Sequence, residues 1–539
     1  MAGRATLLRG GLVIDGTGAD PQRRDLVLAD GAVADGVIVD RVADATIIDV
    51  TGRLVLPGFV DIHTHSDLTL LSAPDAPSRV RQGITTEVIG NCGLGTFPVG
   101  RAVASAIGPD RAGIRAAVSY LDLDPAIAWD WEDLGGYREE LIRRRPAVNV
   151  AALVGHLPLH AGVCGFDNLP PTDHQLRRMQ ELLAGELAAG AVGLSTGLVY
   201  PPLTTVGEQE LTMLAEVVRD HDALFAWHVR DYADDLVSSV QLALRVARRT
   251  GCRTQISHLN AVGRRNWPAI GPVLAEIDAA RVDGVEVGID LYPYLYGNAP
   301  LAQLLPDWAQ QGPVERWRPL LAERDVRRRI ADHWRDPAVG WDEITISRIA
   351  AADDCTLIGH SVAASAADLR TDPVTLALDL LTDHGTGVLM VAGGRSTEVM
   401  NRVLGHPGCV IASDGLSLDP HGPTGTGSPH PRSYGCFARY LADVISTDPP
   451  PSDLSDAVAR CTSRPAARVG LNRGRLLTGA AADVVVIDPA RLADRASFSE
   501  PQQFPAGIEH VLVGGVPVVR DGQPTGARPG VMLSATTYP

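Results

Sequence analysis

Leu54-Val-Leu-Pro-Gly-Phe-Val-Asp-Ile-His63-Thr-His65 is the stretch of sequence that decides the fold of this chain. It is a short apolar run, typical of a buried strand, and it ends in two histidines. Side chains two residues apart on a strand face the same side, so His63 and His65 can present two imidazoles to one metal ion. Later apolar runs also end in potential ligands, which are Cys92, His228, His258 and Asp414.

Strand-like and helix-like segments alternate through the middle of the chain, which is typical of βα units and a parallel sheet. Strands are predicted near 58–63, 84–90, 148–155, 191–195, 223–228, 253–258, 284–291 and 409–414, and helices near 174–189, 207–220, 233–250 and 268–280. Eight strands of this kind predict an α/β fold, a (β/α)8 TIM barrel, with its active site at the carboxyl ends of the strands. The potential ligands fall at those ends.

The two chain ends resemble each other and are predicted to form one small β-sandwich domain from residues 1–57 and 466–539. Their short β-branched runs are Ala5–Leu8, Leu12–Ile14, Asp25–Leu28, Gly36–Val39 and Ala45–Asp49, then 483–488, 508–513 and 516–519. The barrel is predicted to occupy 58–465. An extra strand near 386–392 and an Arg- and Trp-rich stretch at 298–350 do not fit a minimal barrel. The latter is interpreted as an insertion over the barrel mouth, either a lid or a homo-oligomer contact.

Composition excludes several functions. The formal charge of −16 over 539 residues argues against nucleic acid or an anionic membrane as a partner. No apolar run reaches the ~18 residues that span a bilayer, and the start lacks a secretory signal, so the cytoplasm is the expected location. Seven cysteines without Cys-x-x-Cys spacing do not suggest a disulfide scaffold. The chain has no lysine, which excludes a Schiff base, a P-loop and a lysine-carbamate metal bridge.

The residue types at the strand ends are those of a zinc hydrolase. Cys92 lies between Asn91 and Gly93, and its thiolate would be a strong zinc ligand and the best available bridge. Asp414 ends the last strand, where a carboxylate could take a proton from a metal-bound water and pass it to a leaving group. Each residue also has an ordinary structural interpretation: a buried cysteine, a core histidine, or an aspartate that caps a turn.

Gly193-Leu-Ser195-Thr-Gly197 matches the nucleophile elbow of serine hydrolases and follows a strand. Asp231 or Asp290, with His360, could complete such a triad. That interpretation leaves His63, His65 and Cys92 without a function. A third hypothesis is a metal-binding barrel that has lost catalysis, against which the presence of Asp414 argues.

Together these segments resemble the N-acyl-D-amino-acid deacylases (D-aminoacylases) of the amidohydrolase superfamily, over nearly the whole chain. The resemblance rests on Pro57–Asp67, Gly90–Gly93, Ser195–Pro202, His228–Arg230, Asp290–Tyr294, Ala412–Gly415, His430–Gly435 and Gly474–Asp483. It implies hydrolysis of the amide of a small N-acylated amino acid or a related compound.

The resemblance also implies the roles of the residues. Cys92, His228 and His258 would hold one tight zinc, and His63, His65, the shared Cys92 and Asp414 a second, weaker one. Metal-bound hydroxide would attack the acyl carbonyl, with Asp414 as the proton shuttle. Tyr292 and Arg432 would lie near the substrate's α-carboxylate.

One position departs from the family pattern. Asn260 stands where the family usually has a lysine that helps to bind the α-carboxylate. A charge-assisted contact is worth ~1.5–3 kcal/mol, so its loss predicts an altered substrate. This could be a non-amino-acid or cyclic amide intermediate whose carboxylate is masked. The rival explanation is that a neighbouring arginine compensates.

Overall fold

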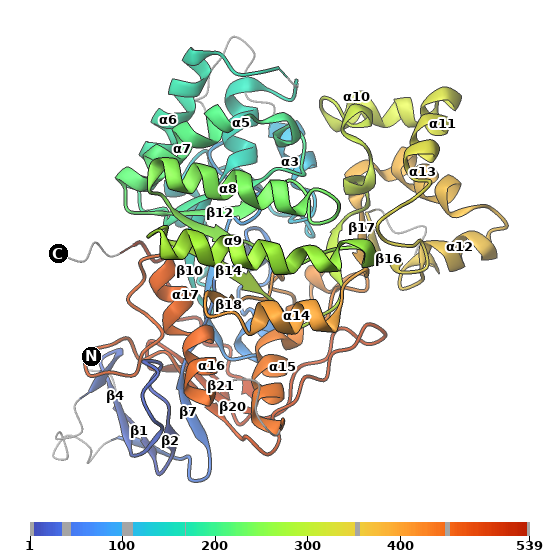
Figure 1. The fold of residues 1–539 in the computed structure, drawn as a ribbon. Coiled ribbons are helices and arrows are strands. Elements are labelled where there is room, and N and C mark those ends of the chain that lie inside the picture. Colours follow the sequence, from blue (N-terminus) through green and yellow to red (C-terminus); the bar gives the residue numbers. More distant parts are fainter. Residues whose placement is uncertain are drawn as a thin grey trace.

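The core of the molecule is a parallel eight-stranded sheet, seen in a computed structural model of the protein (Figure 1). The structure describes residues 5–34, 45–99, 111–167, 169–350, 356–447 and 453–535. In sheet order the strands are β18 (Cys409–Ile411), β14 (Val287–Leu291), β13 (Arg253–Ile256), β12 (Leu224–His228), β11 (Gly193–Gly197), β10 (Asn149–Gly155), β9 (Ile84–Ile89) and β8 (Phe59–Asp61). Each lies within two or three residues of a predicted strand, and the predicted TIM barrel is confirmed.

Backbone hydrogen bonds join the two edge strands of this sheet just beyond their carboxyl ends. Thr64 and Gly415 form a parallel bridge. His65 N–H donates to the Gly415 carbonyl at 2.8 Å, and Asp414 N–H donates to the His63 carbonyl at 2.9 Å. The sheet is thereby drawn into a barrel at the edge where the potential ligands lie.

Helices surround the barrel, and their sequences show why they form. Helix α8 (Leu236–Thr250) buries Val240, Ala243, Leu244 and Ala247 on one face, the spacing of three and four residues that an amphipathic helix requires. It ends at Gly251, whose φ of 73° continues the chain in the left-handed region. The other major helices are α4 (Leu134–Arg144), α5 (His156–Cys164), α6 (Asp173–Ala188), α7 (Glu208–Asp220), α9 (Ile270–Val282), α14 (Thr397–Leu404), α15 (Arg432–Ser446), α16 (Leu454–Cys461) and α17 (Ser463–Arg468).

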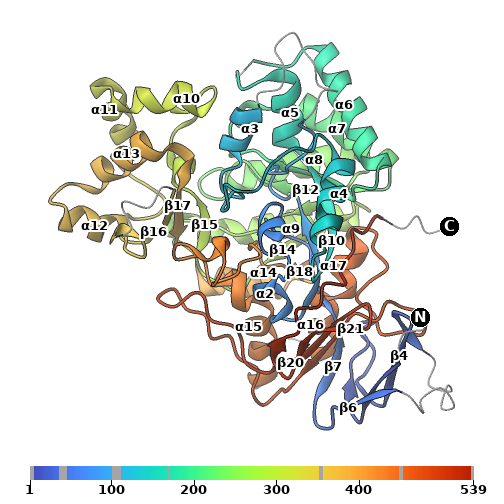
Figure 2. The same cartoon turned by 180° about the vertical axis from the view of Figure 1, so that it is seen from behind.

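Strands from both chain ends pair with each other below the barrel (Figures 1 and 2). One sheet has seven strands in the order β22 (Gln523–Pro524), β21 (Val516–Arg520), β20 (Ile508–Val513), β19 (Val484–Ile487), β7 (Leu54–Pro57), β2 (Leu12–Val13) and β3 (Gln22–Arg23). The other has four, in the order β5 (Ala32–Ala34), β4 (Leu26–Ala29), β1 (Thr6–Arg9) and β6 (Thr46–Asp49). One buried apolar cluster includes residues of both sheets, among them Leu8, Leu28, Val484 and Leu512. The predicted strand at Gly36–Val39 lies outside the described residues.

Between β14 and β18 the chain forms a separate lobe, which stands beside the barrel in Figure 1. Its sheet has the order β15 (Gly297–Pro300), β17 (Val388–Ala392) and β16 (Ile344–Ile349), and β17 corresponds to the extra strand predicted near 386–392. Helices α10 (Val314–Trp317), α11 (Arg324–His333), α12 (Val362–Asp368) and α13 (Pro373–His384) belong to the same lobe. It has its own apolar core, extending from Leu301 to Met390. In the part of the chain that the structure describes, no helix has the length and apolar character to cross a membrane.

A buried ion network also holds the barrel closed. Arg79 is fully buried, with its Nε 2.9 Å from Glu87 Oε1 and its Nη1 3.6 Å from Asp61 Oδ2. Arg79 Nη1 also donates to Ser413 Oγ at 3.0 Å, and Ser413 N–H donates to Asp61 Oδ1 at 2.9 Å. Burial raises the pKa of Glu87 to about 7 even though Arg79 opposes the rise. The network therefore ties β8, β9 and the end of β18 together around one cation.

We predict that Arg79→Ala lowers the free energy of unfolding by about 3–5 kcal/mol, because two buried carboxylates lose their counter-ion. Chemical denaturation followed by fluorescence measures the change. The control is Arg335→Ala, which removes an exposed partner of Asp332 and should change stability by less than about 0.5 kcal/mol. Equal effects of the two substitutions would contradict the assignment of Arg79 to barrel closure.

Candidate metal centre and its pocket

The predicted ligands converge at the carboxyl ends of the barrel strands. His63 and His65 follow β8, Cys92 follows β9, His228 ends β12, His258 follows β13 and Asp414 follows β18. All six are buried. Residues up to 351 positions apart are thus brought to one point, as expected for parallel strands around a barrel.

Two groups of ligand atoms share Cys92. The ligand atoms of His63, His65, Cys92 and Asp414 all lie within 4.8 Å of one another, and so do those of Cys92, His228 and His258. Cys92 Sγ is 3.2 Å from His63 Nε2 and 3.4 Å from His258 Nε2. Nitrogen and sulfur bound to one tetrahedral zinc are separated by about 3.5 Å, so both contacts have the spacing of ligand pairs.

The ionisation of the group formed by Cys92, His228 and His258 also fits a metal. Burial lowers the pKa of His228 to about 3 and that of His258 well below its ordinary value, so both imidazoles are neutral and have a lone pair to donate. Neither ring nitrogen of the buried His228 has a hydrogen-bond partner among the described residues. Burial raises the pKa of the Cys92 thiol, so its thiolate needs a cation nearby. Thiolate, imidazole and carboxylate are the donors that zinc prefers, and the residues therefore fit zinc.

Three of these residues have backbone conformations that side chains rarely adopt. Cys92, His258 and Asp414 have φ angles of 54°, 35° and 50°. A non-glycine residue in this region costs about 1–3 kcal/mol, and such residues gather at functional sites, where the surroundings enforce them. Each stands two or three residues after a strand, among the ligand residues at the carboxyl ends of the barrel strands.

Asp290 orients two of the histidines, a role that the sequence analysis missed. Its Oδ1 lies 3.2 Å from His63 Nδ1 and accepts from the His258 N–H at 2.8 Å. Its Oδ2 accepts from Gln255 Nε2 at 2.9 Å. A carboxylate on the far nitrogen of a ligand histidine fixes the ring and the tautomer. The position of Asp290 near the end of a predicted strand is the signal that could have indicated this role.

Asp414 is held between the histidines and a buried arginine. Its Oδ1 lies 3.0 Å from His65 Nε2, and its Oδ2 lies 2.8 Å from Arg432 Nη1. Burial alone would raise the pKa of Asp414, but Arg432 and His63 hold it well below its usual range. Arg432 also donates to the Tyr120 hydroxyl at 3.3 Å and packs against the Tyr292 ring. The guanidinium predicted to lie near the substrate carboxylate is therefore engaged with Asp414.

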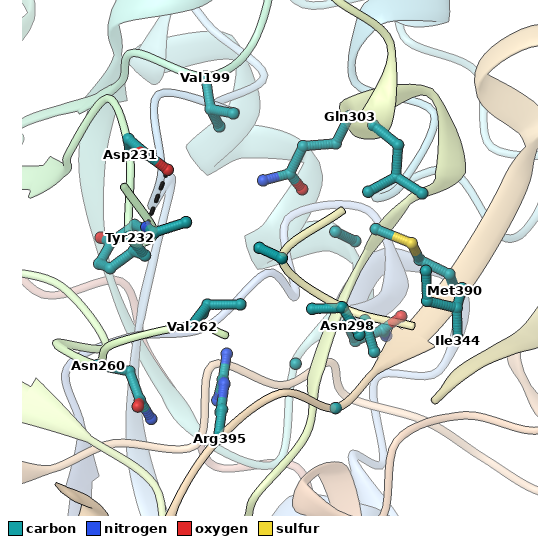
Figure 3. A pocket seen from close by; sticks show the side chains of 18 of the residues that line it. Val199, Asp231, Tyr232, Asn260, Val262, Asn298, Gln303, Ile344, Met390 and Arg395 are labelled. Carbon is teal, nitrogen blue, oxygen red and sulfur yellow. Dashed lines mark hydrogen bonds between the residues drawn. The ribbon is translucent and has the colours of Figure 1, made fainter. Parts of the chain in front are cut away.

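A pocket of about 500 Å³ opens above the ligands. Its floor includes His65, Cys92, His228, His258 and Asp414. Asn260 and Tyr292, which the resemblance placed near the substrate, also line it. The lobe between β14 and β18 contributes a wall that contains the apolar residues Leu304, Trp341, Ile344 and Met390, of which Figure 3 labels the last two. The pocket thus joins a polar floor to an apolar wall.

The hydroxyl of Ser195 is bonded to backbone next to Cys92 and does not face this pocket. It accepts from the Gly93 N–H at 2.8 Å and donates to the Gly90 carbonyl, and Ser195 is fully buried. His360, the base proposed for a triad, is exposed in the other lobe, where its carbonyl accepts from the Ile346 N–H of β16. Ser195 therefore shapes the loop that carries Cys92, which explains the short sequence match without a nucleophile.

We predict that the purified protein holds zinc and that Cys92→Ala loses it, because Cys92 belongs to both groups of ligands. Elemental analysis of protein purified without a metal-binding tag gives the zinc content per chain. Cys252→Ala is the matched control, since Cys252 is equally buried but its thiol donates to the Arg253 carbonyl and it belongs to neither ligand group. Zinc retained by Cys92→Ala, or lost from both variants, would refute the site.

Comparison with known proteins gives the same picture. The model of the amidohydrolase family matches residues 46–294 and 412–519, and the lobe lies between the two matches. An N-acyl-D-glutamate deacylase from Alcaligenes xylosoxydans xylosoxydans is 35% identical over 528 residues, covering 98% of this chain and 96% of that protein.

Solved structures agree in fold over the full length. The N-acyl-D-glutamate deacylase from Bordetella bronchiseptica, complexed with zinc and a phosphonate mimic of the tetrahedral intermediate, is 34% identical with a TM-score of 0.82, covering 99% of this chain and 100% of that one. A D-aminoacylase with a binuclear metal centre is 30% identical with a TM-score of 0.79, covering 98% and 99%. This chain belongs to the amidohydrolase family.

Proposed function

We propose that this protein is a zinc-dependent amidohydrolase that cleaves the amide bond of an N-acyl-D-amino acid, releasing a carboxylate and a free D-amino acid. The proposal rests on the convergence of two groups of potential ligands that share Cys92, one with His63, His65 and Asp414 and the other with His228 and His258. All of these residues except His63 line one pocket. Relatives named N-acyl-D-glutamate deacylase and D-aminoacylase, similar over nearly the whole chain, support this substrate class.

The chain would hold its metal with two sets of side chains. Cys92, His228 and His258 would bind one zinc tightly, and His63, His65 and Asp414 would bind a second more weakly with the shared Cys92. When bound in such a site, zinc polarises a carbonyl and lowers the pKa of water to about 7. Asp290 keeps His63 and the backbone of His258 in place for this purpose.

Asp414 would move the proton. Its low pKa keeps the carboxylate ionised, so it can accept a proton from the attacking water. Arg432 fixes Oδ2, while Oδ1 remains beside His65 in the ligand group. As the C–N bond breaks, the protonated Asp414 would donate this proton to the departing nitrogen, which restores the carboxylate.

The apolar wall of the pocket would receive the rest of the substrate. Leu304, Trp341, Ile344 and Met390 fit an apolar acyl chain or amino-acid side chain and exclude water from the reacting bond. Because these residues belong to the lobe between β14 and β18, we propose the lid function for it. A role in homo-oligomer contact stays a prediction.

We predict that Asp414→Asn lowers kcat by about 10²- to 10⁴-fold, because an amide cannot accept the proton. Steady-state kinetics on a panel of N-acetyl-D-amino acids (leucine, phenylalanine, glutamate) and their L-enantiomers measures the effect. Zinc content is measured on the same samples, to separate loss of proton transfer from loss of metal. A kcat within threefold of the wild type, with zinc bound, would rule out Asp414 as the proton carrier.

A second variant separates the zinc mechanism from a serine mechanism. Ser195→Ala should keep activity within about tenfold of the wild type, since Ser195 only supports the Cys92 loop and loss of its hydrogen bonds costs about 1–3 kcal/mol, largely in stability. The same assay, with thermal unfolding as the control for stability, gives the result. Complete loss of activity in a folded, zinc-loaded Ser195→Ala protein would favour the serine hydrolase.

A further inference from the structure

Arg395 is a cation without a counter-ion in the wall of the pocket. It follows β17 after two glycines and lines the same pocket as His228 and His258. Its Nη1 donates to the Tyr292 hydroxyl at 2.6 Å and to the Tyr296 carbonyl at 3.1 Å. No carboxylate forms an ion pair with it in the described ranges, and its buried Nε has no hydrogen-bond partner there. A half-buried guanidinium in this state is ready to bind an anion.

The neighbours of Arg395 hold its guanidinium in place. Gly297 lies so close that a Cβ at that position would be 2.5 Å from Arg395 Nη2, so any larger residue would displace the guanidinium. Gly297 pairs with Ala392 across the sheet of the lobe, which fixes the distance between the two segments. The Tyr292 ring lies 5.1 Å from the guanidinium carbon, within the range of a cation–π contact.

A second donor without a partner lines the same pocket. Asn260 is 1% exposed, and its Oδ1 accepts from the Ala261 N–H at 2.8 Å. Its Nδ2 therefore remains free, and it has no partner among the residues described. Asn260 and Arg395 both line this pocket, and Figure 3 draws both at the lower left of the view, while Met390 and Ile344 lie at the right. The Tyr292 hydroxyl, which accepts from Arg395, still has its own proton to donate.

We propose that Arg395, with the Tyr292 hydroxyl and Asn260 Nδ2, forms the site that binds the α-carboxylate of the substrate. The inference rests on the proposed function and deepens it. A guanidinium and two neutral donors complement the negative charge and the two acceptor oxygens of a carboxylate. Arg432, which the resemblance placed near this carboxylate, pairs with Asp414 and is not among the residues that line the pocket, so we assign the charge to Arg395.

Asn260 was explained either by a substrate without a free carboxylate or by a compensating arginine, and this site favours the arginine. An arginine from the lobe supplies the positive charge that position 260 does not, so the substrate keeps a free carboxylate. The charge reaches the pocket from a different segment of the chain, and Asn260 contributes a neutral hydrogen bond to the same group.

The test compares Arg395→Gln with wild type on the best N-acetyl-D-amino acid of the panel and on its carboxamide, which lacks the negative charge. We expect Arg395→Gln to raise KM for the carboxylate by about ten- to hundredfold and to leave the carboxamide within about threefold. Arg395→Lys should restore part of the loss. Arg265→Gln is the matched control, because Arg265 lines the same pocket but is paired with Asp234 and Asp336.

Equal losses on both substrates, or no loss on either, would overturn the carboxylate assignment. Calorimetric titration of the zinc-loaded proteins with the same N-acetyl-D-amino acids distinguishes failure of the carboxylate assignment from failure of the proposed function. If wild type hydrolyses none of them, the proposed function fails. The role of Arg395 in carboxylate binding is still supported if the wild-type protein binds these compounds and Arg395→Gln binds them at least tenfold more weakly. Absence of binding to wild type would overturn both.

Discussion

Closure of the barrel between β8 and β18 is the constraint on which the rest of the structure depends. His63 and His65 follow one of these strands and Asp414 the other, so the ligand group of His63, His65, Cys92 and Asp414 forms only when the two edges meet. Backbone hydrogen bonds between His65 and Gly415 and between Asp414 and His63 form that junction. The buried Arg79 network lies directly beneath it, so the same segments that complete the fold also assemble the ligands.

The site concentrates groups that are unfavourable without a metal. His228 is buried with no hydrogen-bond partner for either ring nitrogen among the described residues, and burial raises the pKa of the Cys92 thiol. The backbone at Cys92, His258 and Asp414 is strained. Each of these features costs free energy in the folded chain. A bound cation would offset these costs by accepting the lone pairs. The lobe between β14 and β18 adds an apolar wall and one positive charge, Arg395, so the charged end of a substrate and its apolar end have separate places in the pocket.

The barrel strands and the ligand residues that follow them were predictable from sequence, because both are encoded by local patterns. Each barrel strand is an apolar run, and the ligands follow those runs, so topology alone brings them together. The role of Ser195 was not predictable, since a five-residue pattern does not tell whether its hydroxyl faces backbone or a pocket. Arg395 carried no local signal either. It follows a strand of the lobe and not a barrel strand, and the pairing of β15 with β17 brings it beside Tyr292.

X-ray absorption at the zinc edge of the wild-type protein tests whether the residues at the ends of the barrel strands hold zinc, because it identifies the atoms bound to the metal. We predict one sulfur ligand, from Cys92, at about 2.3 Å from the zinc, with nitrogen and oxygen ligands at about 2.0–2.1 Å. A first shell without sulfur, or with two or more sulfurs, would contradict it. In either case zinc would not be held by the residues at the ends of the barrel strands.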